Sequence, residues 1–209
     1  MKKLILAASF TAIAAGSTTA QELTFAPEVG INLSNVSGDV SNTDMKIGLK
    51  VGGVVNIPAG GGFYLQPGLF FHQKGFKTSS EMLGIKATST TNFNYLELPV
   101  NVLYRVDLGN AGGIFASAGM YAAYAVSGKV KGEVAGIEAS EKVDFGSGAD
   151  EMKPFDWGAN FGLGYETPWG VYVRGQYGLG LGNLSNVDDF KMKNNSIQIS
   201  VGYLIGRNR

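Results

Sequence analysis

Residues 94–107 read NYLELPVNVLYRVD, and this stretch decides the class of fold. Its even positions from 96 to 106 are Leu, Leu, Val, Val, Tyr and Val, whereas its odd positions include Glu97, Asn101 and Arg105. A period of two indicates an extended strand, here longer than the usual length of about five or six residues. A dry core would not accept these polar residues unpaired, so one face of the strand is apolar and the other is polar.

A second long alternating strand lies within Gly113–Lys129, after the turn LGNAG at 108–112. Its apolar positions carry Ile114, Met120 and Tyr124, with alanines between them. Two long consecutive strands of this kind are typical of a transmembrane β-barrel hairpin, which faces lipid on one side and a polar lumen on the other.

The N-terminus has the three parts of a secretory signal. Lys2 and Lys3 form a basic head, an apolar run follows at 4–8, and small residues lead to Ala20. This pattern predicts a signal peptide at 1–20, cleaved after Ala20, and a mature barrel domain at 21–209. The apolar run is too short and interrupted to be a transmembrane helix, which needs about 20 residues.

Composition excludes several classes of function. The 209 residues contain 17 basic and 17 acidic side chains, and this balance argues against binding to nucleic acid. The absence of cysteine excludes disulfides, thiol nucleophiles and thiolate metal sites. Glycine is abundant, at 31 residues without a collagen repeat, and in strands it marks the bends that a small closed barrel requires.

Alternation recurs along the chain and predicts eight strands. Pro67 is unusual inside one of them, because proline removes a donor from the strand ladder and normally lies at an edge or bulge. The predicted strands are 25–33, 46–57, 63–74, 94–107, 113–129, 155–166, 171–179 and 196–205.

The connections between these strands alternate in length. Segment 133–143, inside one long connection, could extend a hairpin beyond the membrane. Outer-membrane barrels have short periplasmic turns and longer outer loops. The sequence therefore predicts an all-β, eight-stranded antiparallel up-and-down transmembrane β-barrel with a narrow, filled interior. The predicted long loops are 34–44, 78–88, 129–153 and 182–194, and the short turns are 58–62, 107–112 and 167–170.

Four short stretches carry a resemblance to a known family. They are FFHQKG at 70–75, NYLELPV at 94–100, DWG at 156–158 and GY at 202–203. Together with the signal sequence, these stretches resemble the porin-like outer-membrane β-barrel family. The resemblance covers nearly all of the mature chain. The resemblance implies the fold and the outer-membrane location, and it implies little about activity. Residues 203–209 depart from it, because they lack the terminal aromatic residue common among such barrels.

The polar face supplies the candidate site. In a narrow barrel its charges would pair across the interior as an internal plug, because an unpaired buried charge is costly. A small aqueous pore lined by the same residues is the alternative, for which eight strands leave little room. The predicted lumen network is Lys46, Lys50, Gln66, His72, Glu97, Asn101, Arg105, Asp156, Asn160, Glu166, Arg174 and Gln176, with Glu28, Lys74 and Gln198 on the same face.

Other candidate sites are weaker. His72 is the single histidine, so a Ser-His-acid lipid hydrolase remains open, although no serine lies in a Gly-x-Ser-x-Gly context. A metal site lacks a second histidine or a cysteine, and we expect neither catalytic residues nor cofactors. The aromatic residues expected to contribute to an interfacial girdle are Trp157, Tyr165, Trp169, Tyr172 and Tyr177.

The sequence therefore favours a monomeric outer-membrane barrel that contacts membrane lipid and has a structural or surface-interaction role through its long loops. A small-solute transport barrel and the His72 hydrolase are alternatives. A soluble periplasmic lipid-binding barrel is a further alternative, in which the apolar face would point inward and the charged face outward.

Overall fold

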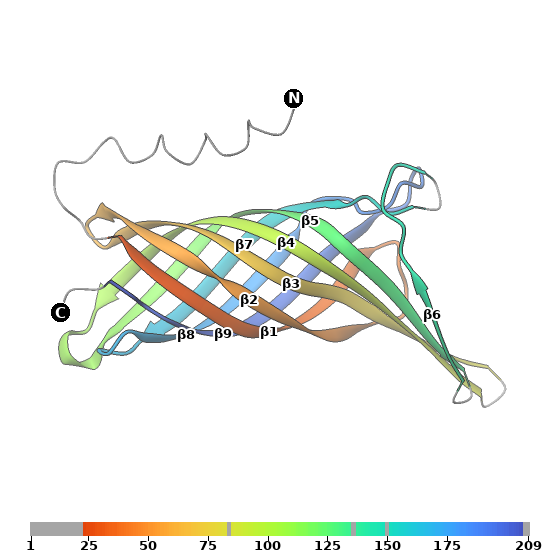
Figure 1. The fold of residues 1–209 in the computed structure, drawn as a ribbon, viewed down its shortest axis with the longest axis horizontal. Coiled ribbons are helices and arrows are strands. Elements are labelled where there is room, and N and C mark those ends of the chain that lie inside the picture. Colours follow the sequence, from red (N-terminus) through yellow and green to blue (C-terminus); the bar gives the residue numbers. More distant parts are fainter. Residues whose placement is uncertain (1–22, 83–84, 135–136, 149–150, 207–209) are drawn as a thin grey trace, which may run out of the picture.

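The computed structural model describes residues 23–82, 85–134, 137–148 and 151–206, so the predicted signal peptide lies outside the described residues. Within these ranges, eight antiparallel strands close into a ring and a further strand, β6, adds to one side of its rim (Figure 1). The predicted eight-stranded antiparallel barrel is confirmed. In the described part of the chain, no helix is long and apolar enough to cross a membrane.

The strands follow one another around the ring, each paired with its predecessor apart from β7, which pairs with β5 because β6 lies outside the ring. Residues 28–38 of the first strand pair with residues 192–202 of the last, which closes the barrel. The strands are β1 (Thr24–Gly38), β2 (Thr43–Gly60), β3 (Phe63–Met82), β4 (Ile85–Asp107), β5 (Gly113–Val134), β6 (Ile137–Lys142), β7 (Phe155–Glu166), β8 (Val171–Gly180) and β9 (Met192–Tyr203).

The two ends of the barrel differ. The start of β1 and the end of β9 lie at one end, together with the connections 61–62, 108–112 and 167–170, and we name this the short-turn end (Figure 1). The opposite, long-loop end carries β6 and the connection between β8 and β9. The turns at 107–112 and 167–170 lie where the sequence predicts them, whereas β2 continues into the predicted turn 58–62 as far as Gly60.

The apolar face of each strand points outward. On β4, the even residues from Leu96 to Val106 are between 40% and 53% exposed, whereas Tyr95 and Glu97 are at most 1% exposed. This apolar band has the length of a membrane-spanning strand, about 9–11 residues. The alternative of a soluble barrel with an inward apolar face is wrong, because the charged side chains occupy the interior and the aliphatic ones surround it.

Two predicted loops are largely strand. β1 and β2 together leave only residues 39–42 of the predicted loop 34–44 outside strands, and β3 and β4 fill most of 78–88. The predicted loop 129–153 likewise begins with the end of β5 and with β6. Polar residues continue the ladders there because a strand beyond the apolar band needs no lipid-facing side chains. The connection between Gly180 and Met192 agrees more closely with the predicted loop 182–194.

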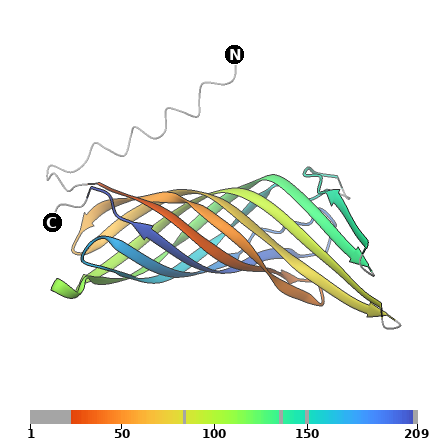
Figure 2. The same cartoon turned by 60° about the horizontal axis from the view of Figure 1, so that its bottom comes forward.

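These extensions form a small sheet beyond the apolar band, which we name the outer sheet. It consists of residues 77–82 of β3, 85–92 of β4, 128–134 of β5 and β6, and its strands project past their neighbours (Figure 2). β6 pairs with β5 from Lys129↔Lys142 to Val134↔Ile137, so this part of the predicted loop 129–153 follows the alternative of a hairpin that extends beyond the membrane. All six residues of β6 are exposed.

Pro67 lies inside β3, where the sequence makes it unusual. It pairs with Val100 of β4, whereas pairing with β2 is interrupted between Val54 and Ile57. Because proline lacks only its N–H, the ladder is disturbed on one side and kept on the other.

Candidate functional site: the barrel interior and the outer sheet

Glu28 organises the first group of charges in the lumen. Its carboxylate lies 3.1 Å from Lys50 Nζ and 3.5 Å from Arg174 Nη1, and all three side chains are at most 2% exposed. Tyr172 donates its hydroxyl to Glu28 at 2.7 Å, and Ser200 donates at 2.8 Å. We name these five residues the Glu28 cluster. Because every oxygen of the carboxylate has a cation or donor beside it, the buried charge is well compensated.

Aromatic rings enclose the Glu28 cluster. Lys50 Nζ lies 4.3 Å from the centroid of the Phe70 ring, and the Arg174 guanidinium lies 5.5 Å from that of Phe115. The Tyr172 ring lies so close to β9 that a Cβ at Gly202 would be 2.3 Å from it, so only glycine fits there. The prediction that Tyr172 belongs to an interfacial girdle is wrong, since its side chain lies in the lumen and is 3% exposed.

Lys74 organises a second group. Its Nζ lies 2.8 Å from Glu97 and 3.3 Å from Asp156, and it sits 4.1 Å from the centroid of the Tyr121 ring. His72 Nδ1 lies 3.0 Å from the same Glu97 oxygen. We name these five residues the Lys74 cluster. It joins β3, β4, β5 and β7 across the lumen, and Asn194 of β9 adds a hydrogen bond to Asp156 at 3.0 Å.

The surroundings of His72 bear on the hydrolase alternative. Glu97 could orient the imidazole, but Nε2 is buried without a hydrogen-bond partner, so no hydroxyl nucleophile of the described residues contacts it. A Ser-His-acid site needs that contact. Within the described ranges, no three acidic or histidine side chains gather as a metal site would require.

The long-loop end of the lumen is covered by two connections. Leu184 is fully buried against Val36 and Met192, with Met152 packed beside them. Asn186 donates from Nδ2 to backbone carbonyls of the other connection, among them Gly146 at 3.0 Å. Residues 143–148, 151–153 and 181–191 therefore form one packed unit over this mouth. Sequence reasoning missed it because none of these segments shows a periodic pattern.

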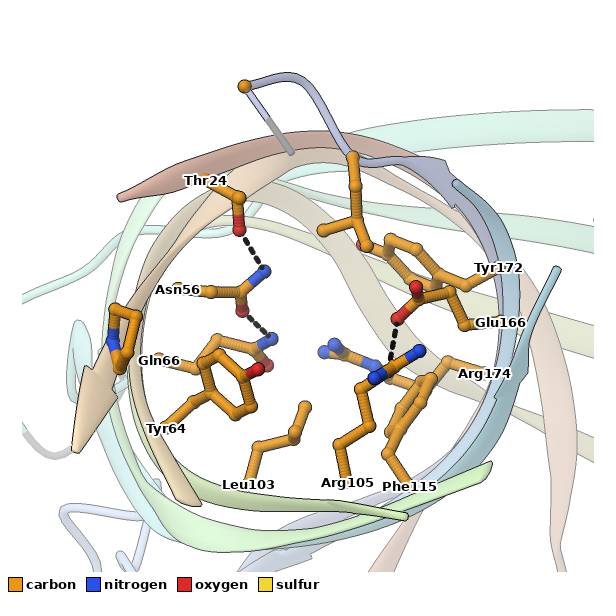
Figure 3. A pocket seen from close by; sticks show the side chains of 13 residues that line it. Thr24, Asn56, Tyr64, Gln66, Leu103, Arg105, Phe115, Glu166, Tyr172 and Arg174 are labelled. Atoms are coloured by element: carbon orange, nitrogen blue, oxygen red, sulfur yellow. Dashed lines mark hydrogen bonds and ion pairs between the residues drawn. The ribbon is translucent and has the colours of Figure 1, made fainter. Parts of the chain in front are cut away.

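The short-turn end is hollow instead. A cavity of about 460 Å³ opens there, and Figure 3 shows polar and aromatic side chains pointing into it from several strands. Arg105 contributes an ion pair with Glu166 at 3.0 Å and another with Asp107 at 3.0 Å. Gln66 donates to Asn56 at 2.6 Å on the opposite wall (Figure 3). The inner wall of the cavity includes Phe115, Tyr172 and Arg174, which belong to or adjoin the Glu28 cluster.

All the residues proposed for the lumen network lie on the inner face. Lys50 and Arg174 meet at Glu28, His72 and Asp156 meet around Lys74 and Glu97, and Arg105 meets Glu166. Sequence reasoning missed Tyr121 and Ser200, although their places in the alternation put them on the inner face, and it missed Asn194 because that residue lies in the predicted loop 182–194. Buried on the same face outside these groups are Lys46, Asn101, Asn160, Gln176 and Gln198.

Comparison with known structures gives similar proteins at low sequence identity. Ail, the attachment invasion locus protein of Yersinia pestis, is 14% identical with a TM-score of 0.41, and the match covers 88% of this chain and 99% of that chain. Neisserial surface protein A is 11% identical with a TM-score of 0.45, over 88% and 97% of the two chains. The N-terminal β-barrel domain of Pseudomonas aeruginosa OprF is 8% identical with a TM-score of 0.38, over 86% and 97%.

A search among curated protein sequences finds no significant match. Comparison with protein families matches residues 19–186 to the family described as outer membrane protein beta-barrel domain. This match spans most of the strands of the ring and agrees with the outward apolar band and the charged interior. The chain is therefore a member of the outer membrane protein beta-barrel domain family.

Proposed function

We propose that this protein is a non-enzymatic structural and surface-interaction barrel, which holds its outer sheet outside the cell. The observation that carries the proposal is the continuation of β3, β4 and β5 beyond the apolar band into an exposed sheet with β6 at its side. Outer-membrane barrels keep short turns in the periplasm and longer connections outside, so the long-loop end is the outer one. An exported chain also needs the predicted signal peptide, and the mass of the protein extracted from outer membranes tests its cleavage after Ala20.

The side chains that cross the lumen support this role over transport. The Glu28 cluster and the Lys74 cluster cross the interior at two levels, and the packed unit around Leu184 covers the outer mouth. The interior of an eight-stranded barrel is just wide enough for side chains. We propose that these groups act as a plug that stabilises the barrel and leaves binding to its exterior.

The outer sheet has the chemistry of a binding surface. β6 pairs on one side with β5 and is the last strand of the sheet order, so its other edge presents backbone N–H and C=O groups. Such an edge can add an extended segment of a partner by strand pairing, with neighbouring side chains supplying specificity. We propose that the partner of this edge is an extended segment of a protein on another surface, which pairs with β6 as an added strand.

The test distinguishes the contribution of the outer sheet to attachment from that of the rest of the barrel. In one variant, an Asn-Gly turn replaces residues 79–87 and a second replaces 132–141, so that the sheet is shortened and the spanning strands remain. A matched control replaces residues 187–190, in the other outer connection, with glycine and serine and keeps Asn186. Cells that display each protein are measured for attachment to surfaces coated with extracellular protein. We expect the shortened variant to lose attachment and the control to keep it. Equal attachment by both, with both barrels folded, would remove the outer sheet from the proposed function.

A further inference from the structure

Three lysines of the outer sheet lie together on its outward face. Asn92 of β4 pairs with Lys129 of β5, which pairs with Lys142 of β6, and directly paired residues share a face. Lys131, two residues further along β5, lies on the same face. The opposite face of β5 points inward at this level, because a Cβ at Gly128 would be 2.9 Å from the Phe145 ring. We name Lys129, Lys131 and Lys142 the lysine patch.

The charges in this patch lack compensation. Like charges directly opposite each other on paired strands destabilise the pair, and Lys129 and Lys142 are such a pair. Among the described residues, no ion pair within 4.0 Å involves any of the three lysines. Strand pairing therefore brings these positive charges together, and no carboxylate of the described residues lies within 4.0 Å of them.

The acidic residues nearby lie elsewhere on the sheet. Glu133 and Glu138 pair with each other one row further from the membrane, on the same face. Glu141 pairs with Val130, on the opposite face from the patch. Lys77 of β3 is separated from the patch by β4. It is paired with Asp44 of β2, so it already has an acidic neighbour. The outward face is thus basic close to the apolar band and acidic further out.

The patch lies at the level of lipid headgroups. Val126 is the last exposed apolar residue of β5, and Lys129 follows three residues later, or about 10 Å along the strand. With a strand tilt of about 45°, Lys129 stands about 7 Å above the hydrocarbon. The headgroup layer is about 5–8 Å thick on each side of a bilayer, so the ammonium groups reach it.

We propose that the lysine patch binds the phosphate groups of lipopolysaccharide in the outer leaflet beside β5 and β6. Lysine is a good ligand for phosphate as a flexible point charge, and a lipid phosphate between Lys129 and Lys142 would relieve their repulsion. Thr90, Asn92 and Ser140 lie in the same two rows and offer hydroxyl and amide donors to the sugar and phosphate oxygens. This site is separate from the edge of β6 that binds the partner in the proposed function.

The experiment compares lipids that differ only in phosphate. The mature barrel is reconstituted in phosphatidylcholine nanodiscs that contain either lipid A or enzymatically dephosphorylated lipid A, and bound lipid is counted by native mass spectrometry. We expect tighter binding of phosphorylated lipid A, and a loss of about 25-fold in the K129Q/K142Q variant, because each lysine near a charged membrane surface contributes about five-fold. The K129R/K142R variant keeps both charges and should retain binding.

The matched control is K191Q/K193Q, which removes two lysines at the same end of the barrel, on and beside β9. It should bind lipid A as the unchanged protein does, and heat-induced gel shifts show that each variant is folded. Equal binding of the two lipids, or equal losses in K129Q/K142Q and K191Q/K193Q, would overturn the proposal. Displacement of lipid A by an equal concentration of inorganic phosphate would also overturn it, since the site would then take any phosphate anion.

Discussion

At the scale of single residues, Lys74 holds the Lys74 cluster together. We predict that Lys74→Met lowers the free energy of unfolding by about 3–5 kcal/mol, because Glu97 and Asp156 would stay buried without their shared cation. Urea unfolding of the barrel in lipid vesicles, followed by tryptophan fluorescence, measures the change.

The control replaces the whole group of charges. Lys74→Met combined with Glu97→Gln and Asp156→Asn should recover most of the lost stability, because no buried carboxylate is then left without its cation. A triple variant as unstable as Lys74→Met alone would show that packing against Tyr121, and not the unpaired charges, sets the cost.

The sequence predicts whether a side chain faces the lumen or the lipid better than it predicts which residues that side chain contacts. The alternation around Glu97 was enough to place it inside, because a charged side chain cannot face lipid. It could not show that Glu97 meets Lys74 and His72 whereas Glu28 meets Lys50 and Arg174, since contacts across a barrel depend on strand tilt and stagger.

At the scale of elements, β6 differs from the strands of the ring. It pairs on one side only and all of its side chains are exposed. We predict that the amides of 137–142 exchange with solvent through local opening of near-zero free energy, whereas those of 96–106 exchange only with loss of the barrel. Hydrogen exchange with mass spectrometry of the folded protein measures both segments. Equal protection of the two would mean that the outer sheet is as stable as the membrane-spanning ladder.

The strand extensions also show why the predicted loops 34–44 and 78–88 were too long. Lipid imposes an apolar residue at every second position, and this rule ends where the strand leaves the bilayer. Thr78 and Thr88 have a high preference for strands, but in a polar stretch they read as part of a loop. The apolar pattern therefore predicts the membrane-spanning part of each strand but not the residues by which the strand continues beyond the bilayer.

At the scale of the whole molecule, charged side chains cross the interior of the barrel at successive levels. We predict that the purified protein gives no stepwise currents in planar lipid bilayers, because the Glu28 cluster, the Lys74 cluster and the packed unit around Leu184 obstruct the lumen at successive levels. A porin of about sixteen strands, recorded in the same chamber, shows that the assay detects an open channel. Reproducible single-channel steps from the barrel would favour the transport alternative.

The closure of the ring has a consequence for the time course of folding. The strands that close the ring, β1 and β9, are separated by nearly the whole chain, so we expect them to pair last, because contacts between distant segments form slowly. Glu28 lies in β1, and its partners Arg174, Tyr172 and Ser200 lie in β8 and β9. If β1 and β9 pair last, this carboxylate has only Lys50 of the adjacent strand as its partner until β8 and β9 are in place. We therefore expect the Glu28 cluster to make closure of the ring more favourable than backbone pairing alone would, and a chain that lacks β8 and β9 to lose this contribution.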